Sequence, residues 1–153
     1  MSAAEVRVGA AVVAPVLDAA AAARATLVNE ARAALLESGT AVTVAQLASA
    51  TNRSVDTARK WATRKRDAGR LVLVQLHDGT LLVPTIQLDE AFDLNEQVAH
   101  RTQRLSEWGM GPWAIWDWWH TPNGWLLDGQ SPADAIRAGD FDALDRAIDG
   151  LLQ

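Results

Sequence analysis

The residues with the clearest chemical potential are basic side chains gathered in one short stretch. Seven of the fourteen Lys and Arg residues lie between Arg53 and Arg70, where only Asp56 and Asp67 oppose them, so this window carries a charge of +5. The whole chain carries −5. A local excess of cations in an acidic protein favours contact with a polyanion. The pattern therefore predicts a phosphate-rich partner, with nucleic acid as the leading candidate.

The elements that would position these cations have the layout of a helix-turn-helix. Thr43 is expected to cap a short helix over residues 44–50, and Ser54 to cap a second helix over residues 55–67. A turn at residues 52–54 separates the two helices. The apolar positions expected to face inward are Val44, Leu47 and Ala48 in the first helix and Val55, Ala58 and Ala62 in the second.

The exposed side of the second helix supplies the candidate DNA contacts. Residues at the start of a recognition helix reach base edges, and basic residues further along it meet phosphates. The candidate base contacts are Ser54, Asp56, Thr57 and Lys60, and the candidate backbone contacts are Arg53, Arg59, Arg64, Lys65 and Arg66. Trp61 is expected to pack beneath the helix. One copy would bind weakly, so we expect a homodimer on paired half-sites; the alternative is a solvated basic helix without a ligand.

Directly after the second helix the hydrophobic period changes from helical to strand-like. Residues 70–76 and 80–83 are apolar and rich in β-branched side chains. The intervening His77-Asp78-Gly79 carries the Asp-Gly signature of a hairpin turn. This position predicts a β-hairpin wing behind the helix-turn-helix.

Tryptophan is concentrated in the C-terminal half, where six of the seven lie within eighteen residues. On a helix beginning at Pro112, Trp113, Trp116 and Trp119 share one face, whereas Trp118 points elsewhere. One such face can fill a small helical core. The remaining indoles, above all Trp118 and Trp125, are candidate anchors for a protein partner. The alternative is that every indole is buried in the core.

Together these patterns predict a mainly α-helical fold, with an N-terminal helix-turn-helix and a small β-hairpin wing followed by a C-terminal helical domain. Three segments are expected: a loosely ordered leader over residues 1–17, a DNA-binding domain over 18–87, and the helical domain over 88–153. The other expected helices cover residues 18–37 and 88–108, begin at Pro112, and run from Pro132 to Gly139 and from Asp140 to Gly150.

The sequence gives little support for catalysis or metal binding. It contains no cysteine, and His77, His100 and His120 each lack a second histidine at ligand spacing. Asp117 and His120 stand three residues apart, yet no nucleophile or glycine-rich phosphate loop accompanies them. We therefore expect a binding protein, not an enzyme, without cofactor or metal.

The longest apolar stretch does not have the character of a membrane segment. It covers residues 10–25 and is interrupted by Pro15 and Asp18. Glu5 and the single Arg7 before it make a poor basic head for a signal peptide. We therefore expect a cytoplasmic protein with no membrane partner.

Several short motifs occur together in the C-terminal half. They are Pro84-x-x-Gln87-Leu88-Asp89, the tryptophan helix over residues 113–119, Gly129-x-Ser131-Pro132 and Gly139-Asp140. In this combination residues 82–153 resemble the toxin-binding domain of Xre/MbcA/ParS-like antitoxins. Members of that family usually couple this domain to an N-terminal helix-turn-helix, which agrees with the expectation for residues 43–67.

The resemblance implies an antitoxin of a type II toxin–antitoxin module. Such a protein neutralises a co-encoded toxin of the RES fold, which consumes NAD, and represses its own operon. In the family the last helices and the tail cover the toxin's active-site cleft, which points to residues 140–153 here. This tail is short and carries no cation, so apolar burial and acidic pairing are the expected contacts. The candidate toxin-binding residues are Trp118, Trp125, Asp142, Asp145, Asp149, Leu151, Leu152 and Gln153.

The predicted architecture is also compatible with two other functions. One is a stand-alone DNA-binding regulator whose C-terminal domain mediates homodimerisation, and the other is a phage or plasmid adaptor. A RES-type reading frame next to this gene would favour the antitoxin over both.

Overall fold

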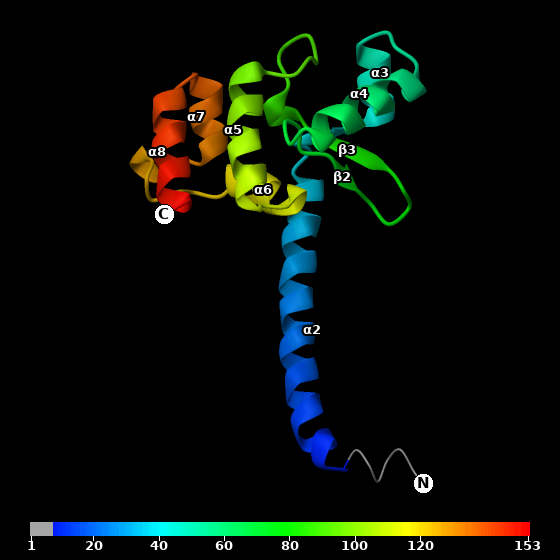
Figure 1. The fold of residues 1–153 in the computed structure, drawn as a ribbon, viewed down its shortest axis with the longest axis vertical. Coiled ribbons are helices and arrows are strands. Elements are labelled where there is room, and N and C mark those ends of the chain that lie inside the picture. Colours follow the sequence, from blue (N-terminus) through cyan, green and yellow to red (C-terminus); the bar gives the residue numbers. More distant parts are fainter. Residues whose placement is uncertain (1–7) are drawn as a thin grey trace. The chain divides into compact units, whose positions relative to one another are not determined.

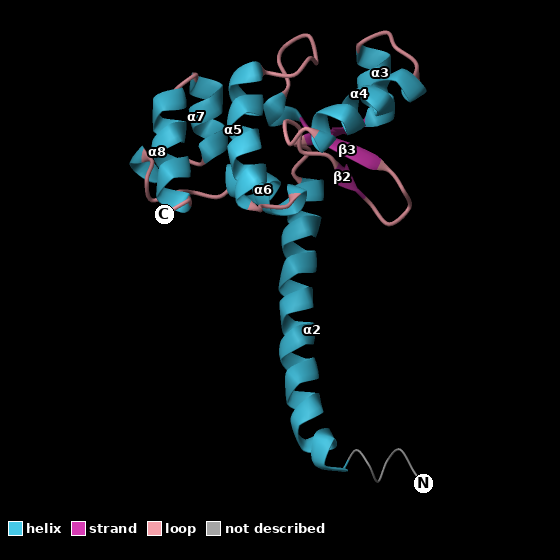
Figure 2. Ribbon diagram, in the orientation of Figure 1, coloured by secondary structure: helices cyan, strands magenta, loops and turns pink. Residues whose placement is uncertain are grey.

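The computed structural model describes residues 8–153, with side chains from residue 18 onward. The described chain is mainly α-helical and includes a small three-stranded antiparallel sheet (Figures 1 and 2). It divides after Glu37 into two compact units. None of the described helices combines the length and the apolar character that crossing a lipid bilayer requires.

The first unit contains one long helix, α2, over Val8–Glu37. Alanine dominates its sequence, and alanine has the highest intrinsic helix propensity. The helix includes residues 8–17, which the sequence assigned to a loosely ordered leader; the rest of that predicted leader, residues 1–7, lies outside the described residues. The difference arises because these ten residues have no amphipathic period, the signal on which the prediction depended.

The second unit begins with strand β1 (Ala41–Thr43), followed by helices α3 (Val44–Ala50) and α4 (Val55–Asp67). Thr43 and Gln46 form a reciprocal capping box at the start of α3, and the Ser54 hydroxyl accepts a hydrogen bond from the Thr57 amide at the start of α4. Both predicted N-caps are confirmed. The bounds of both helices are also the predicted ones, because their signals are local.

The sheet has the strand order β1-β3-β2, where β2 is Val74–Gln75 and β3 is Leu81–Pro84. Val74 pairs with Leu82 in the predicted hairpin, and Val42 pairs with Val83 on the other edge of β3. The predicted strand over residues 70–76 is reduced to two residues, and the pairing of β1 was not predicted. A three-residue strand has too little sequence to show a period, and its partner lies forty residues away.

A buried glutamine binds the segment over residues 70–73, which belongs to no strand. Gln87 is the last residue of the 3₁₀ turn η1 (Thr85–Gln87), and its side chain is fully buried. Its Oε1 accepts from the Val72 amide at 2.9 Å, and its Nε2 donates to the Val72 carbonyl at 2.8 Å. One side chain thus replaces the two ladder hydrogen bonds that a neighbouring strand would have made.

Helix α5 covers Glu96–Trp108, eight residues shorter at its start than predicted. Residues 88–95 form a loop instead, in which Asp89 Oδ1 accepts from the amides of Ala91 and Asp93 at 2.8 and 3.0 Å. Phe92, predicted as an apolar helix position, has a φ of 58° in this loop. The apolar period there is misleading because Asn95, which caps α5, begins the helix only after the loop closes.

The chain ends with helices α6 (Pro112–Trp119), α7 (Pro132–Ala138) and α8 (Phe141–Leu151), with the 3₁₀ turn η2 (Leu127–Gly129) between α6 and α7. Pro112, Pro132 and the caps at Ser131 and Asp140 lie at the predicted helix starts. Gly139 closes α7 with a φ of 70°, as predicted. Gly150 does not close α8, because the helix continues through it to Leu151.

Two sets of apolar side chains hold the second unit together. The first joins α3, α4 and the sheet and includes Leu47, Ala62, Leu73 and Val83. The second lies among α5–α8, where Trp116, Trp119, Leu105, Leu144 and Ile148 are almost completely buried. Ala99 of α5 belongs to the first set, and α7 contacts η1 directly after β3, so these elements connect the two sets.

Candidate functional site

Helix α4 has one apolar side and one basic side. Ala58 and Ala62 are buried against α3 and the sheet, and the small side chains allow the two helices to approach closely. Trp61 is partly buried against the same core, as predicted. Val55, predicted to face inward, is exposed instead, because it stands in the first turn, before the helix reaches α3.

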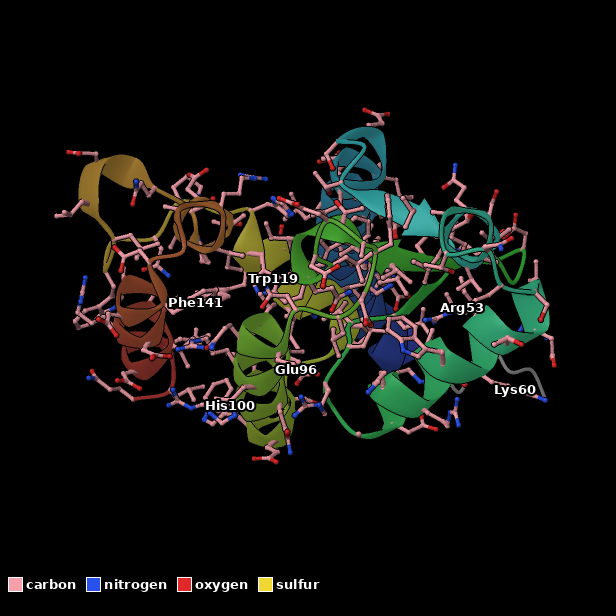
Figure 3. All side chains as sticks on the ribbon, turned by 90° about the horizontal axis from the view of Figure 1, so that it is seen from above. Arg53, Lys60, Glu96, His100, Trp119 and Phe141 are labelled. Carbon is pink, nitrogen blue, oxygen red and sulfur yellow. The ribbon has the colours of Figure 1, made fainter. Side chains whose placement is uncertain are left out.

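The predicted phosphate-binding side chains are distributed over the outer side of α4 and the turn before it. Arg53, Arg59, Arg64 and Arg66 are exposed and Lys65 is half-buried. Arg53, Arg59 and Lys65 make no ion pair with any described residue, whereas Arg66 pairs with Asp67 at 3.0 Å. Figure 3 places Arg53 and Lys60 on the opposite side of the second unit from Trp119 and Phe141. The predicted cations are therefore mostly exposed and lie on α4 and the turn before it.

The four predicted base contacts divide into two kinds. Ser54 donates a hydrogen bond from its hydroxyl to Thr57 Oγ1 at 2.8 Å, while it also caps the helix, so both hydroxyls are engaged locally. Asp56 and Lys60 form an exposed ion pair one helical turn apart, at 3.1 Å. The charged heads of these two residues are exposed, as is the Arg59 guanidinium in the same two turns of α4.

The hairpin between β2 and β3 carries no Lys or Arg. Its turn contains His77 and Asp78, and Asp78 Oδ1 accepts from the Thr80 amide at 2.9 Å. The hydrogen bonds from Thr80 lower the pKa of the Asp78 carboxyl, and like any unshifted aspartate it is ionised at neutral pH. This tip is acidic or neutral, and the basic surface belongs to α4.

The tryptophans separate into buried and exposed ones. Trp116 and Trp119 are buried, and Trp113 stacks on Trp116 with ring centroids 5.5 Å apart. The Trp116 indole donates to Thr40 Oγ1 at 3.2 Å, which connects α6 to the residues before β1. The predicted shared face of α6 is thus confirmed, with Trp113 only partly buried at its edge.

Of the two predicted indole anchors, Trp118 is half-buried and Trp125 is 56% exposed. Trp125 lies over Gly150: a Cβ built on this glycine would come within 2.3 Å of the indole. The neighbouring Leu127 is 78% exposed. Gly150 therefore accommodates an aromatic ring from a distant loop, which explains a glycine inside α8.

Two of the three predicted toxin-binding carboxylates are engaged within the chain. Asp145 accepts two hydrogen bonds from the Arg101 guanidinium, at 2.8 and 3.0 Å, and the same guanidinium lies 4.8 Å from the Phe141 ring centroid. Asp149 pairs with Arg104 at 2.9 Å. Asp142 is exposed and has no ion pair among the described residues. Leu151 and Leu152 are half-buried and Gln153 is exposed.

The arginines of α5 were not predicted to matter, although their spacing contained a signal. Arg101 and Arg104 are one turn apart, and so are Asp145 and Asp149, so two helices packed side by side can match these pairs. Arg70, counted with the basic window, is likewise paired with Glu96 and contacts Gln103. The identity of such partners depends on which helices pack together, which a single sequence does not specify.

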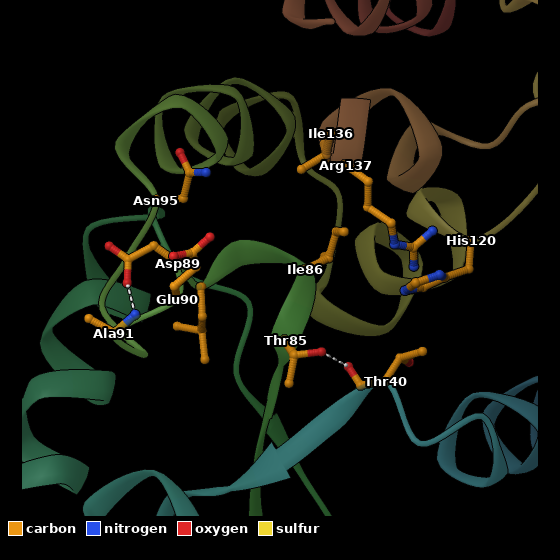
Figure 4. Close-up of a pocket in the computed structure, with 11 residues that line it drawn as sticks. Thr40, Thr85, Ile86, Asp89, Glu90, Ala91, Asn95, His120, Ile136 and Arg137 are labelled. Atoms are coloured by element: carbon orange, nitrogen blue, oxygen red, sulfur yellow. Dashed lines mark hydrogen bonds between the residues drawn. The ribbon is translucent and has the colours of Figure 1, made fainter. Parts of the chain in front are cut away.

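A cavity of about 800 Å³ opens between η1, the loop after it and α7. Figure 4 shows Asp89, Glu90 and Asn95 on one side and Ile136, Arg137 and His120 on the other. Burial, and next the charge of Arg137, lower the pKa of His120, whose Nε2 has no hydrogen-bond partner among the described residues. Asp89 is occupied by loop amides, and Arg137 pairs with Asp134. We assign no ligand to this cavity.

Comparisons with known proteins bear on the fold alone. No protein-family model matches the sequence, and no curated protein matches it. Among solved structures, the chain is similar to the NMR structure of Rv2175c, with a TM-score of 0.52 and 17% sequence identity. The similarity covers 70% of this chain and 80% of that one, so the two proteins share a fold over most of their length.

Proposed function

We propose that residues 41–84 form a winged helix-turn-helix that binds duplex DNA, with α4 as the recognition helix. The observation that carries the proposal is the two-sided character of α4: Ala58 and Ala62 pack on α3 and the sheet, whereas cations occupy the outer side. Cations on one exposed helix match the charge of a phosphate backbone, and an α-helix fits the major groove.

The proposal assigns the phosphate contacts to α4 and the turn before it, not to the wing. The wing tip carries an ionised Asp78 and no Lys or Arg, so it would be repelled by phosphates at neutral pH. Arg53, Arg59 and Lys65 have no competing ion pair within the described chain and are the strongest phosphate-binding candidates.

Replacement of Arg59 and Lys65 by alanine is expected to weaken binding to any duplex and to reduce its salt dependence. Each lost phosphate contact should lower the slope of log affinity against log salt by about 0.9. Fluorescence anisotropy with a labelled duplex over a salt series measures both quantities. The matched control is Arg146→Ala, which removes an exposed cation from α8 and should leave the slope unchanged. Equal slopes for the double variant and the wild type would contradict the proposal.

A second function, the antitoxin activity that the resemblance implies, is favoured by the exposed apolar surface formed by Trp125 and Leu127. Large apolar side chains in an exposed turn are typical of anchors that become buried in a complex. In this proposal the protein captures a RES-type toxin through that surface and the end of α8, with Asp142 and Gln153 as further contacts, and represses its own operon as a homodimer in the cytoplasm.

The antitoxin proposal is tested by co-purification with the product of an adjacent RES-type gene. Trp125→Ala combined with Leu127→Ser should abolish co-purification and the rescue of growth, whereas Trp108→Ala, at a similarly exposed indole on α5, should retain both. Truncation at Asp140 is a poorer test, because Leu144 and Ile148 of α8 are core residues.

The stand-alone regulator remains the other proposal for the C-terminal part, and the ion pairs of α8 favour it. Asp145 and Asp149 are held by Arg101 and Arg104, so they are less available to a toxin than the sequence suggested. A stable homodimer that persists when Trp125 and Leu127 are replaced, together with no capture of a toxin, would support this function.

A further inference from the structure

The ion pair between Asp56 and Lys60 is the most informative feature of the proposed DNA-binding surface. The Lys60 Nζ lies 3.1 Å from Asp56 Oδ2, and the two side chains are 70% and 64% exposed, respectively. An acidic side chain here has a cost in a helix that approaches DNA, because it faces a polyanion. In the first turn the Asp56 carboxylate stabilises α4 through the helix dipole. An acidic residue on another side of the same turn, away from the DNA, would give the same stabilisation.

Several other polar groups of α4 are engaged within the helix itself. The Ser54 and Thr57 hydroxyls are joined to each other and to the helix start. The Thr63 hydroxyl donates to the carbonyls of Arg59 and Lys60, and the Arg64 Nε also donates to the Lys60 carbonyl. In the first two turns of α4 this leaves one carboxylate, Asp56, which is paired with the Lys60 ammonium, and the guanidinium of Arg59, which is unpaired within the described chain.

An acceptor and a donor of this kind have different partners in the major groove. A carboxylate accepts from the N4 amino group of cytosine, and a lysine donates to O6 and N7 of guanine. The backbone positions of the two residues are about 6 Å apart along the helix axis, close to the length of two base-pair steps, so the paired heads must separate to reach different base pairs.

We propose that Asp56 and Lys60 act together as a specificity switch that selects duplexes with a cytosine and, within about two steps, a guanine. This inference rests on the proposed DNA-binding function of α4. On a non-matching duplex Lys60 stays paired with Asp56, and the carboxylate repels the phosphates. On a matching duplex the cytosine amino group donates a hydrogen bond to the Asp56 carboxylate, and Lys60 leaves the ion pair and donates to the guanine.

The test is selection from a randomised duplex library with the full-length chain, followed by anisotropy on the selected duplex and on its single-base variants. The wild type should enrich a C·G pair at one fixed position and a guanine within two steps of it. Replacing that cytosine should weaken wild-type binding by about 5- to 150-fold. Asp56→Asn should lose the preference at that position while binding the unselected library about fivefold more tightly, since one repelling charge is gone. Lys60→Ala should lose the preference at the guanine.

Asp67→Asn is the matched control, because it removes the same charge from the other end of α4, where Asp67 pairs with its neighbour Arg66. This variant should keep the wild-type preference. Thermal melting of both variants excludes unfolding as the cause of a change. A selected site without a C·G preference, or an Asp56→Asn variant that retains it, would overturn the inference while DNA binding stands. Failure of the wild type to retain any duplex at low salt would overturn the proposed function and this inference with it.

Discussion

Replacing Trp116 with alanine is expected to lower the free energy of unfolding by about 3–5 kcal/mol, the usual range for removing a large aromatic side chain from a core. Trp116 is completely buried, stacks with Trp113, and donates its indole hydrogen to Thr40. The substitution therefore removes apolar burial, leaves a cavity between α6 and the residues before β1, and deprives Thr40 of its donor. Urea denaturation followed by circular dichroism measures the loss.

Trp108→Ala provides the matched control for this substitution. Trp108 ends α5 and is 55% exposed, so its removal should change stability by no more than about 0.5 kcal/mol. The contrast tests the division of the tryptophans into core and surface residues. Similar losses for the two variants would mean that Trp116 does not fill the core as described.

Replacing Gln87 with alanine is the second substitution expected to have a large effect, with a loss of about 3 kcal/mol in the free energy of unfolding, since each orphaned buried group costs about 1–3 kcal/mol. The side chain is completely buried, and both ends of its amide are bonded to the backbone of Val72. Alanine would leave the Val72 amide and carbonyl without partners in the interior. The same denaturation measurement applies.

Gln75→Ala is the comparison, because Gln75 is an exposed residue of β2 and its side chain makes no hydrogen bond among the described residues. It should have little effect. If Gln87→Ala lowered stability as little, water or a rearranged loop would have to bind the Val72 amide and carbonyl. The hydrogen bonds between Gln87 and Val72 would then not stabilise the fold.

The role of Gln87 also affects how the resemblance to antitoxins is interpreted. The motif Pro84-x-x-Gln87-Leu88-Asp89 is accounted for by local structure: Gln87 clamps Val72, and Asp89 accepts from the loop amides of Ala91 and Asp93. Ser131 and Asp134 similarly form a capping box at the start of α7. These motif residues therefore specify the fold. Whether the C-terminal part binds a toxin or only mediates homodimerisation depends on exposed residues such as Trp125 and Leu127.

Features whose causes lie within a few residues of one another could be predicted before the fold was known. The caps at Thr43, Ser54 and Asp140, the glycine that closes α7, and the buried face of Trp116 and Trp119 all follow from side-chain–backbone hydrogen bonds or helical spacing. The concentration of cations on α4 also follows, because the period of a helix fixes which side chains share its outer side.

Features that depend on partners distant in the chain became visible in the folded chain. The pairing of β1 with β3, the clamp of Gln87 on Val72, the Trp125 ring over Gly150, and the capture of Asp145 by Arg101 each join residues at least fifteen positions apart. A carboxylate on a helix surface has the same local sequence whether it faces solvent, a partner protein or an arginine of the next helix. The packing of the helices decides which of these three surroundings the carboxylate has. The free energy of an ion pair depends on burial and distance, and neither is encoded in a local sequence pattern.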